Sequence, residues 1–275
     1  MYMKRLVPSI CFAVCLVFAP ALDVARGQPA QEYKPSVGQA GKDVVWVPTP
    51  QVLVDKMLDM AKVTPKDYVI DLGSGDGRTV ITAAKRGSRA LGIEYNPDMV
   101  ELSKRNAAKE GVSDKAQFVK ADLFESDFSQ AQVITMFLLP SINLKLRPKI
   151  LDLKPGTRIV SNTFDMDNWE PDETAEISPT EGCTSYCKAY LWIVPAKAAG
   201  SWKLPEGELT IIQTFQTITG TLKSANNTQQ ISGKLVGDRI SFTAGGAQYS
   251  GRVSGDAMEG TGGSGGSWKA SRVGK

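Results

Sequence analysis

Acidic residues follow three successive apolar segments of this 275-residue chain. Asp71 ends the first segment, Glu94 ends a second at 90–94, and Asp122 follows a third at 116–120. If these segments are parallel strands, their carboxyl ends meet at one edge of a sheet, where ligands of such folds bind. We therefore expect the three carboxylates to converge on one pocket.

A glycine-rich turn follows the first of these acids. Gly73, Gly75 and Gly77 alternate there, so the backbone can take positive φ angles and approach a ligand without an intervening Cβ. The turn lacks the Gly-Lys-Ser/Thr of a P-loop and the G-x-G-x-x-G spacing of dinucleotide enzymes. Asp76, within the turn, would repel a pyrophosphate but favour a cationic group. A glycine-rich turn that binds nothing is the plainer alternative.

The pattern resembles motif I of the class I S-adenosylmethionine-dependent methyltransferases, whose cofactor carries an ammonium and a sulfonium. An acid placed as Glu94 is, 23 positions after Asp71, suits both ribose hydroxyls. In the family an acid at the place of Asp122 binds the adenine amino group, and the next apolar residue packs on the ring. The implied cofactor-binding residues are Asp71, Gly73, Ser74, Gly75, Asp76, Gly77, Glu94, Asp122 and Leu123.

The segments around the motif alternate between strand and helix patterns over residues 44–195. The first helix after the motif is expected at 78–86 and a second ends near Gly111. Further along, the pattern predicts strands at 131–138 and 157–161, a helix at 143–153, and two antiparallel strands at 173–178 and 184–194. This matches an α/β, Rossmann-like, seven-strand methyltransferase sheet.

Shorter segments narrow the resemblance. Residues 45–50 and 137–140 resemble the lysine methyltransferases of the ATP-synthase rotor subunit, and 146–161 resembles the non-SET histone lysine methyltransferases. The fourth strand departs from the Asn-Asn-Phe of the histone enzymes, and the Asn-Pro-Pro-Tyr of adenine and glutamine methylation is missing. A protein lysine or another amine is therefore the expected acceptor, by analogy.

The composition limits the chemistry. The chain has no histidine, which excludes a histidine base, a metal site containing histidine and a Ser-His-Asp triad. Methyl transfer needs mainly positioning and desolvation of the nucleophile, so no catalytic base and no metal are assigned. Core packing is the alternative role for each aromatic candidate. The candidates for the substrate channel are Trp46, Pro48, Thr49, Phe137, Leu138, Pro140, Phe164 and Trp169.

The N-terminus predicts export. Lys4 and Arg5 precede an apolar run at 6–22, which is typical of a signal peptide over 1–27, followed by a flexible segment at 28–43. The expected compartment is the periplasm, and an uncleaved anchor that holds the domain near a membrane is the alternative. Export conflicts with the cytosolic synthesis of S-adenosylmethionine. Either the cofactor reaches that compartment, or the chain is not exported, or the fold has lost its activity.

Two cysteines remain after the predicted signal peptide. Cys183 and Cys187 would lie ~13 Å apart on a straight strand, so a disulfide requires the chain to bend at 184–186. A disulfide and two free thiols are both compatible with the sequence. Two thiols without a histidine or a second pair do not form a zinc site.

The chain changes character after a linker at 196–201. Residues 202–275 show short alternating segments separated by turn residues, and the pattern at 232–238 recurs at 250–256. This predicts a small all-β antiparallel meander or barrel, in which Trp202 and Trp268 are expected to pack together. A net charge of +3 is too small for a nucleic-acid binder. The alternative function is an exported binding protein that has a silent methyltransferase fold and a lipocalin-like β domain.

Overall fold

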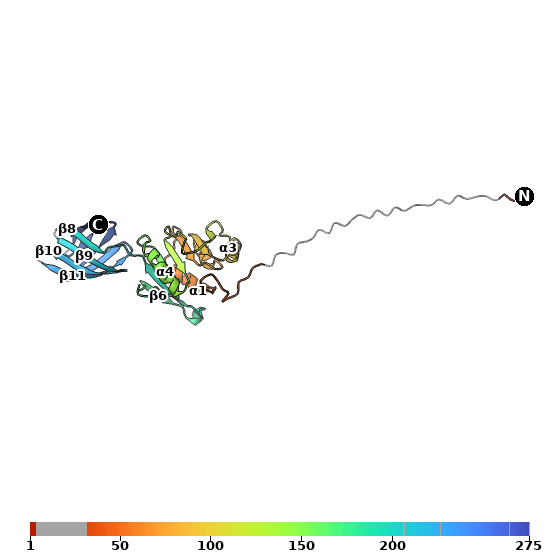
Figure 1. Cartoon of the computed structure of the whole chain (residues 1–275), viewed down its shortest axis with the longest axis horizontal. Helices are drawn as coiled ribbons and strands as arrows, with labels where there is room; N and C mark the ends of the chain where they lie inside the picture. The colour runs from red at the N-terminus through yellow and green to blue at the C-terminus, as the bar shows by residue number, and fades with distance from the viewer. Residues whose placement is uncertain (4–31, 206, 226, 264, 275) are drawn as a thin grey trace. The chain divides into compact units, whose positions relative to one another are not determined.

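The computed structural model describes residues 1–3, 32–205, 207–225, 227–263 and 265–274 (Figure 1). The signal-peptide prediction falls on residues outside this set. Tyr33–Lys275 forms one compact unit that contains every helix and strand considered below. Among the described residues, no helix has both the length and the apolar character needed to span a membrane.

A seven-stranded sheet forms the first half of this unit. Its order is β3-β2-β1-β4-β5-β7-β6, with β7 antiparallel to β5 and to β6 and the other pairs parallel. The predicted methyltransferase sheet is thereby confirmed. Its strands are β1 Tyr68–Leu72, β2 Arg89–Glu94, β3 Ala116–Lys120, β4 Val133–Met136, β5 Arg158–Asn162, β6 Glu173–Glu176 and β7 Lys188–Ile193.

Helices cover both faces of the sheet. α1 Gln51–Met60, α2 Arg78–Lys85 and α3 Pro97–Lys109 pack on one face, and α4 Pro140–Leu151 packs on the other. A short 3-10 turn, η1 Pro179–Glu181, precedes β7. α4 begins three residues before the predicted 143, because a proline at the first helical position lacks only an N–H that the helix would leave unpaired.

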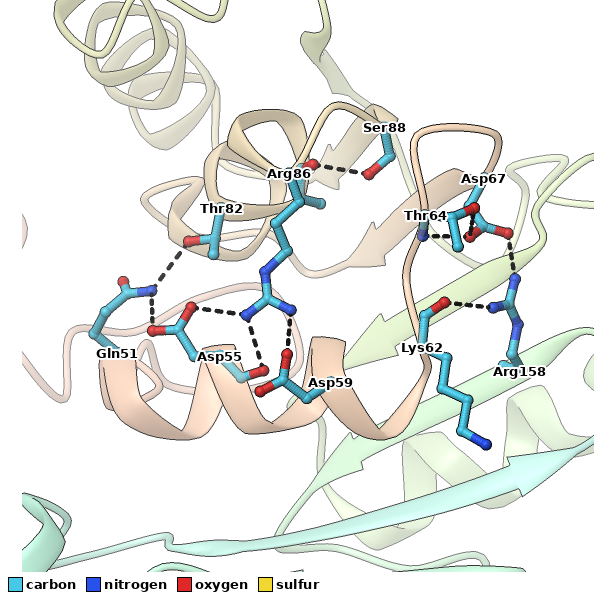
Figure 2. A network of polar contacts seen from close by, with 11 residues as sticks. Gln51, Asp55, Asp59, Lys62, Thr64, Asp67, Thr82, Arg86, Ser88 and Arg158 are labelled. Atoms are coloured by element: carbon cyan, nitrogen blue, oxygen red, sulfur yellow. Dashed lines mark hydrogen bonds and ion pairs between the residues drawn. The ribbon is translucent and has the colours of Figure 1, made fainter.

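Polar contacts attach α1 to α2 (Figure 2). The guanidinium of Arg86 bonds the carboxylates of Asp55 and Asp59 at 3.0 and 2.5 Å, and the side-chain amide of Gln51 donates to the Thr82 hydroxyl at 3.0 Å. These contacts hold α1 beside the helix that follows the glycine-rich turn. The segment immediately before α1, which carries Trp46, Pro48 and Thr49, is thereby positioned near the motif.

The second half of the unit is a closed eight-stranded barrel. The barrel closes where β15 pairs with β8, which settles the choice between a barrel and a curled sheet. Trp202 and Trp268 both lie in its core, where the Trp268 ring meets Phe242 edge-on and the Arg272 guanidinium covers Trp202. Its strands are β8 Gly200–Leu204, β9 Gly207–Thr214, β10 Thr217–Ser224, β11 Thr228–Val236, β12 Arg239–Ala244, β13 Ala247–Ser254, β14 Ala257–Gly262 and β15 Gly266–Arg272.

The internal repeat has a packing explanation. Gly233 in β11 and Gly251 in β13 hold equivalent places in it. A Cβ at Gly233 would lie 2.0 Å from the Ser241 carbonyl oxygen, and one at Gly251 would lie 2.4 Å from that of Glu259. Each repeat therefore needs a glycine where the next strand approaches most closely.

Candidate functional site

The three predicted acids line one pocket at the carboxyl edge of the sheet. Asp71 lies within β1, Glu94 ends β2, and Asp122 follows β3. Both oxygens of the Glu94 carboxylate accept backbone hydrogen bonds, from the N–H groups of Gly75 and Asn96, each at 2.9 Å. Glu94 therefore connects the glycine-rich turn to the end of the neighbouring strand.

The glycine-rich turn needs two of its glycines for different reasons. Gly75 has φ 55°, and a Cβ there would lie 2.7 Å from Nε1 of Trp46, inside the pocket. Gly77 has φ 82° and precedes α2, but a Cβ there would meet the Phe118 ring at 2.8 Å. Gly77 does not line the pocket, so its role is to let the chain turn into the helix rather than to contact a ligand.

The remaining predicted turn residues do line the pocket. The Ser74 hydroxyl is buried and has no hydrogen-bond partner among the described residues, so it is open to a ligand. Asp76 forms an ion pair with Arg78 at 2.6 Å, and the Arg78 guanidinium also donates to the Thr49 carbonyl at 2.8 Å. This arginine thus joins the turn to the segment before α1.

The carboxyl of Asp71 is buried. Burial raises its pKa to about 7, although the Thr135 hydroxyl opposes this by donating a hydrogen bond at 2.6 Å. The charges of Glu94 and Asp76 raise the pKa further. The contribution of Asp71 to stability is therefore fully present below its unfolded pKa of about 4 and is lost as pH rises through about 7. A bound cation would favour the ionised form.

We therefore expect the affinity for S-adenosyl-L-methionine to fall as pH is lowered. The cationic cofactor prefers ionised Asp71, so the affinity should fall several-fold between about pH 7 and 6 and about tenfold for each further unit. Calorimetry at pH 6 in buffers of different ionisation enthalpy should show proton release on binding. Asp71→Asn should bind weakly without this release; equal release in both proteins would contradict the assignment.

Asp122 has a partner that the sequence does not predict. Lys42 Nζ lies 2.5 Å from its carboxylate and 4.9 Å from the centre of the Tyr95 ring. The hydrogen bond from Lys42, with a second from the Phe124 N–H, holds the pKa of Asp122 below its usual range. Lys42 belongs to the predicted flexible segment 28–43, yet residues 39–43 line the pocket. Pairing of Gly38 and Gln39 with the Trp46 backbone holds them there.

Aromatic side chains form the other half of the pocket. Phe137 follows β4, Phe164 follows β5, and Tyr186 precedes β7. The ring of Phe137 lies 6.1 Å from that of Phe164 and 5.2 Å from that of Tyr186. The pocket therefore has an acidic half on β1, β2 and β3 and an aromatic half on β4, β5 and β7. Of the predicted channel residues, Trp46, Pro48, Thr49, Phe137, Leu138 and Phe164 line the pocket.

Two predicted channel residues lie elsewhere. Pro140 is exposed at the start of α4 and is absent from the pocket wall. Trp169 is fully buried, where its ring packs 6.1 Å from Trp192 and 5.7 Å from Phe215. For Trp169 the prediction is corrected: a large apolar ring can be buried in the core instead, and here it is.

Asn143 is a positioning residue without a sequence signal. It is buried in α4, and its side-chain amide donates to the carbonyls of Phe164 and Asp165 at 3.1 and 3.0 Å. These bonds hold the loop that presents the Phe164 ring. The cysteines that flank Tyr186 form a disulfide, so the bend required between Cys183 and Cys187 is present.

The pocket fits S-adenosyl-L-methionine by its own chemistry. It combines three acids for a cation and hydroxyl groups, a buried unpaired Ser74 hydroxyl, and a turn where Gly75 leaves space that a Cβ would fill. No group of three or more metal-ligating side chains occurs among the described residues.

Comparisons with known proteins agree with this geometry. Residues 71–173 match the ANTKMT methyltransferase domain. A protein-lysine N-methyltransferase of Saccharolobus islandicus is 46% identical over 137 residues, which cover 49% of this chain and 85% of that protein. The human lysine N-methyltransferase of the ATP synthase is 35% identical over 128 residues, 46% of this chain and 54% of that protein. The chain thus spans about half the length of the human enzyme.

A solved structure matches the same fold. It is an RNA methyltransferase from Salinibacter ruber in complex with S-adenosyl-L-homocysteine, 47% identical, with a TM-score of 0.51. The match covers 55% of this chain and 95% of that one.

The sheet order and the acidic pocket define an S-adenosylmethionine-dependent methyltransferase of class I, with S-adenosyl-L-methionine as its cofactor. More narrowly, the chain belongs to the methyltransferase family that is represented by the ANTKMT domain and the Saccharolobus enzyme. A binding protein with a silent fold finds no support among these relatives.

Proposed function

We propose that this protein N-methylates a lysine side chain of another protein. The observation that carries the proposal is the aromatic half of the pocket, formed by Phe137, Phe164 and Tyr186 beside the acidic half. When bound, the cofactor supplies a methyl group on a sulfonium. The relatives named as lysine methyltransferases support a lysine acceptor.

The aromatic half suits an amine nucleophile. A lysine must lose its proton to attack, and apolar surroundings lower the pKa of an ammonium by disfavouring its charged form. Phe137 and Leu138 are half-buried and buried respectively, and they supply such surroundings at the end of β4. The same aromatic faces accept the methylated, cationic product by cation–π attraction. The chain's own residues thus orient and desolvate the acceptor.

The proposal predicts where a labelled methyl group is transferred. Full-length protein incubated with labelled S-adenosyl-L-methionine and extract should label protein, and hydrolysis of that protein should yield methylated lysine. The Salinibacter relative makes RNA the competing acceptor. Label that is removed by ribonuclease but not by protease would overturn the lysine assignment, as would label confined to the organic phase.

We also propose that the protein is exported. The apolar N-terminal run and the Cys183–Cys187 disulfide support this, since disulfides persist in oxidising compartments. Fractionation followed by intact mass measurement should find the chain outside the cytoplasm, shortened near residue 27. A full-length chain in the cytosol with both thiols reduced would refute export.

A further inference from the structure

The topology brings a segment before a strand to the edge where other strands end. β7 is antiparallel to β5, so the residues that precede β7 lie at the same edge as the carboxyl ends of β4 and β5. Tyr186 lies two residues before β7, while Phe137 and Phe164 follow β4 and β5 closely. Three neighbouring strands therefore each contribute one aromatic ring to this edge.

A disulfide holds the loop that carries Tyr186. Cys183 and Cys187 are bonded, with their Cα atoms 5.7 Å apart, so the loop between them is closed at both ends. Cys183 is buried in the core on the α1–α3 face, and the Ile177 N–H donates to the Cys187 carbonyl at 2.9 Å. The covalent link thereby attaches this short loop to the domain core.

The position of Tyr186 is unusual for a residue that only fills space. Its backbone has φ 55°, a left-handed conformation that costs free energy for a side chain of this size. Its side chain is 43% exposed, yet it lines the pocket with its ring 5.2 Å from Phe137 at an interplanar angle of 60°. Burial of the ring therefore does not explain the conformation, and a ligand contact does.

We propose that Tyr186, held by the Cys183–Cys187 disulfide, determines acceptor specificity by forming the outer aromatic wall for an aliphatic ammonium. This deepens the function proposed above and rests on it. Phe137 and Phe164 supply two further faces, so a methylated ammonium meets aromatic surface on several sides. The acceptor class is an aliphatic amine on a chain long enough to enter the pocket, with its methylated forms retained better than an uncharged analogue.

The test measures binding separately from catalysis. The full chain is saturated with S-adenosyl-L-homocysteine and titrated with the amide of N-acetyl-trimethyllysine, and then with the analogue in which carbon replaces the charged nitrogen. The native protein should prefer the cationic probe. Tyr186→Ala should weaken binding of the cationic probe about tenfold and remove most of this preference, whereas Tyr186→Phe should retain it because the aromatic face remains.

Tyr95→Ala is the matched control. Tyr95 is 49% exposed and lines the same pocket, but it follows Glu94 in the acidic half, where Lys42 covers its ring. This variant should leave the probe preference intact. A double Cys183→Ser, Cys187→Ser variant should lower the preference in the same direction as Tyr186→Ala, and thermal unfolding should show that the domain remains folded.

The outcomes separate this inference from the proposed function. If label is transferred to lysine but the native protein binds both probes equally, the specificity role is overturned and lysine methylation stands. The role is also overturned if Tyr186→Ala binds the probes as the native protein does. If no lysine is labelled but the preference exists and depends on Tyr186, the proposed function fails while the aromatic ammonium site remains.

Discussion

Replacing Glu94 with alanine is expected to weaken binding of S-adenosyl-L-methionine by about 100-fold or more. The Glu94 carboxylate lines the pocket and accepts hydrogen bonds from the N–H groups of Gly75 and Asn96. Its loss removes an acceptor for the ligand and also releases the glycine-rich turn. Hydrogen bonds to a charged group contribute about 1.5–3 kcal/mol each, so losing two amounts to about 3 kcal/mol or more. Calorimetry with the full chain measures the dissociation constant.

Two further variants make this measurement specific. Glu94→Gln retains one acceptor oxygen and should give an intermediate loss. Glu101→Ala removes a carboxylate on α3 whose side chain is 60% exposed and pairs only with Lys104 across one helical turn, so the affinity should not change. An unchanged dissociation constant in Glu94→Ala would contradict the role of the acidic half.

The acidic half was predictable because its signals are local. Each acid follows a short apolar run, and parallel strands bring their carboxyl ends to one edge whatever the rest of the chain does. The aromatic half was predictable only in part. Phe137 and Phe164 follow β4 and β5, but the pocket position of Tyr186 requires that β7 be antiparallel and that Cys183 and Cys187 be bonded. Neither condition is visible in the residues near Tyr186.

Other features depend on contacts between distant residues. Lys42 lies in a polar stretch without periodicity, and its position depends on Asp122, which is 80 residues away. Trp169 has the composition of a channel residue, but the space around Trp192 determines where its ring lies.

The barrel shows the same limit. β14 and β15 are rich in glycine and serine, so their sequences carry a weak strand signal. They are strands because β13 and β8 provide the neighbouring ladders. Barrel closure joins Trp202 to Arg272 and could not be inferred from either segment alone.

Replacing Arg158 with methionine is expected to destabilise the methyltransferase sheet by about 3 kcal/mol. The Asp67 side chain is 8% exposed and forms an ion pair with Arg158 of β5 (Figure 2). Burial alone would raise the pKa of Asp67, but hydrogen bonds from the Thr64 N–H and hydroxyl and from Arg158 lower it overall. Methionine has a similar volume but no charge, so the variant leaves a buried carboxylate paired only with Thr64. Arg158 also donates to the Ala61 carbonyl at 2.7 Å, which ties β5 to the end of α1.

Hydrogen exchange of the β1 and β5 amides measures the loss within this half of the chain, separately from the barrel. Because the folded pKa of Asp67 is depressed, its stabilisation is present above its unfolded pKa of about 4 and is lost as pH falls through the folded value. Arg158→Met should therefore reduce the stability difference between pH 7 and pH 3. Arg86→Met is the control: its partners Asp55 and Asp59 are 47% and 66% exposed, so the loss should stay below about 1 kcal/mol. Equal losses in the two variants would show that burial of Asp67 does not govern the stability of this ion pair.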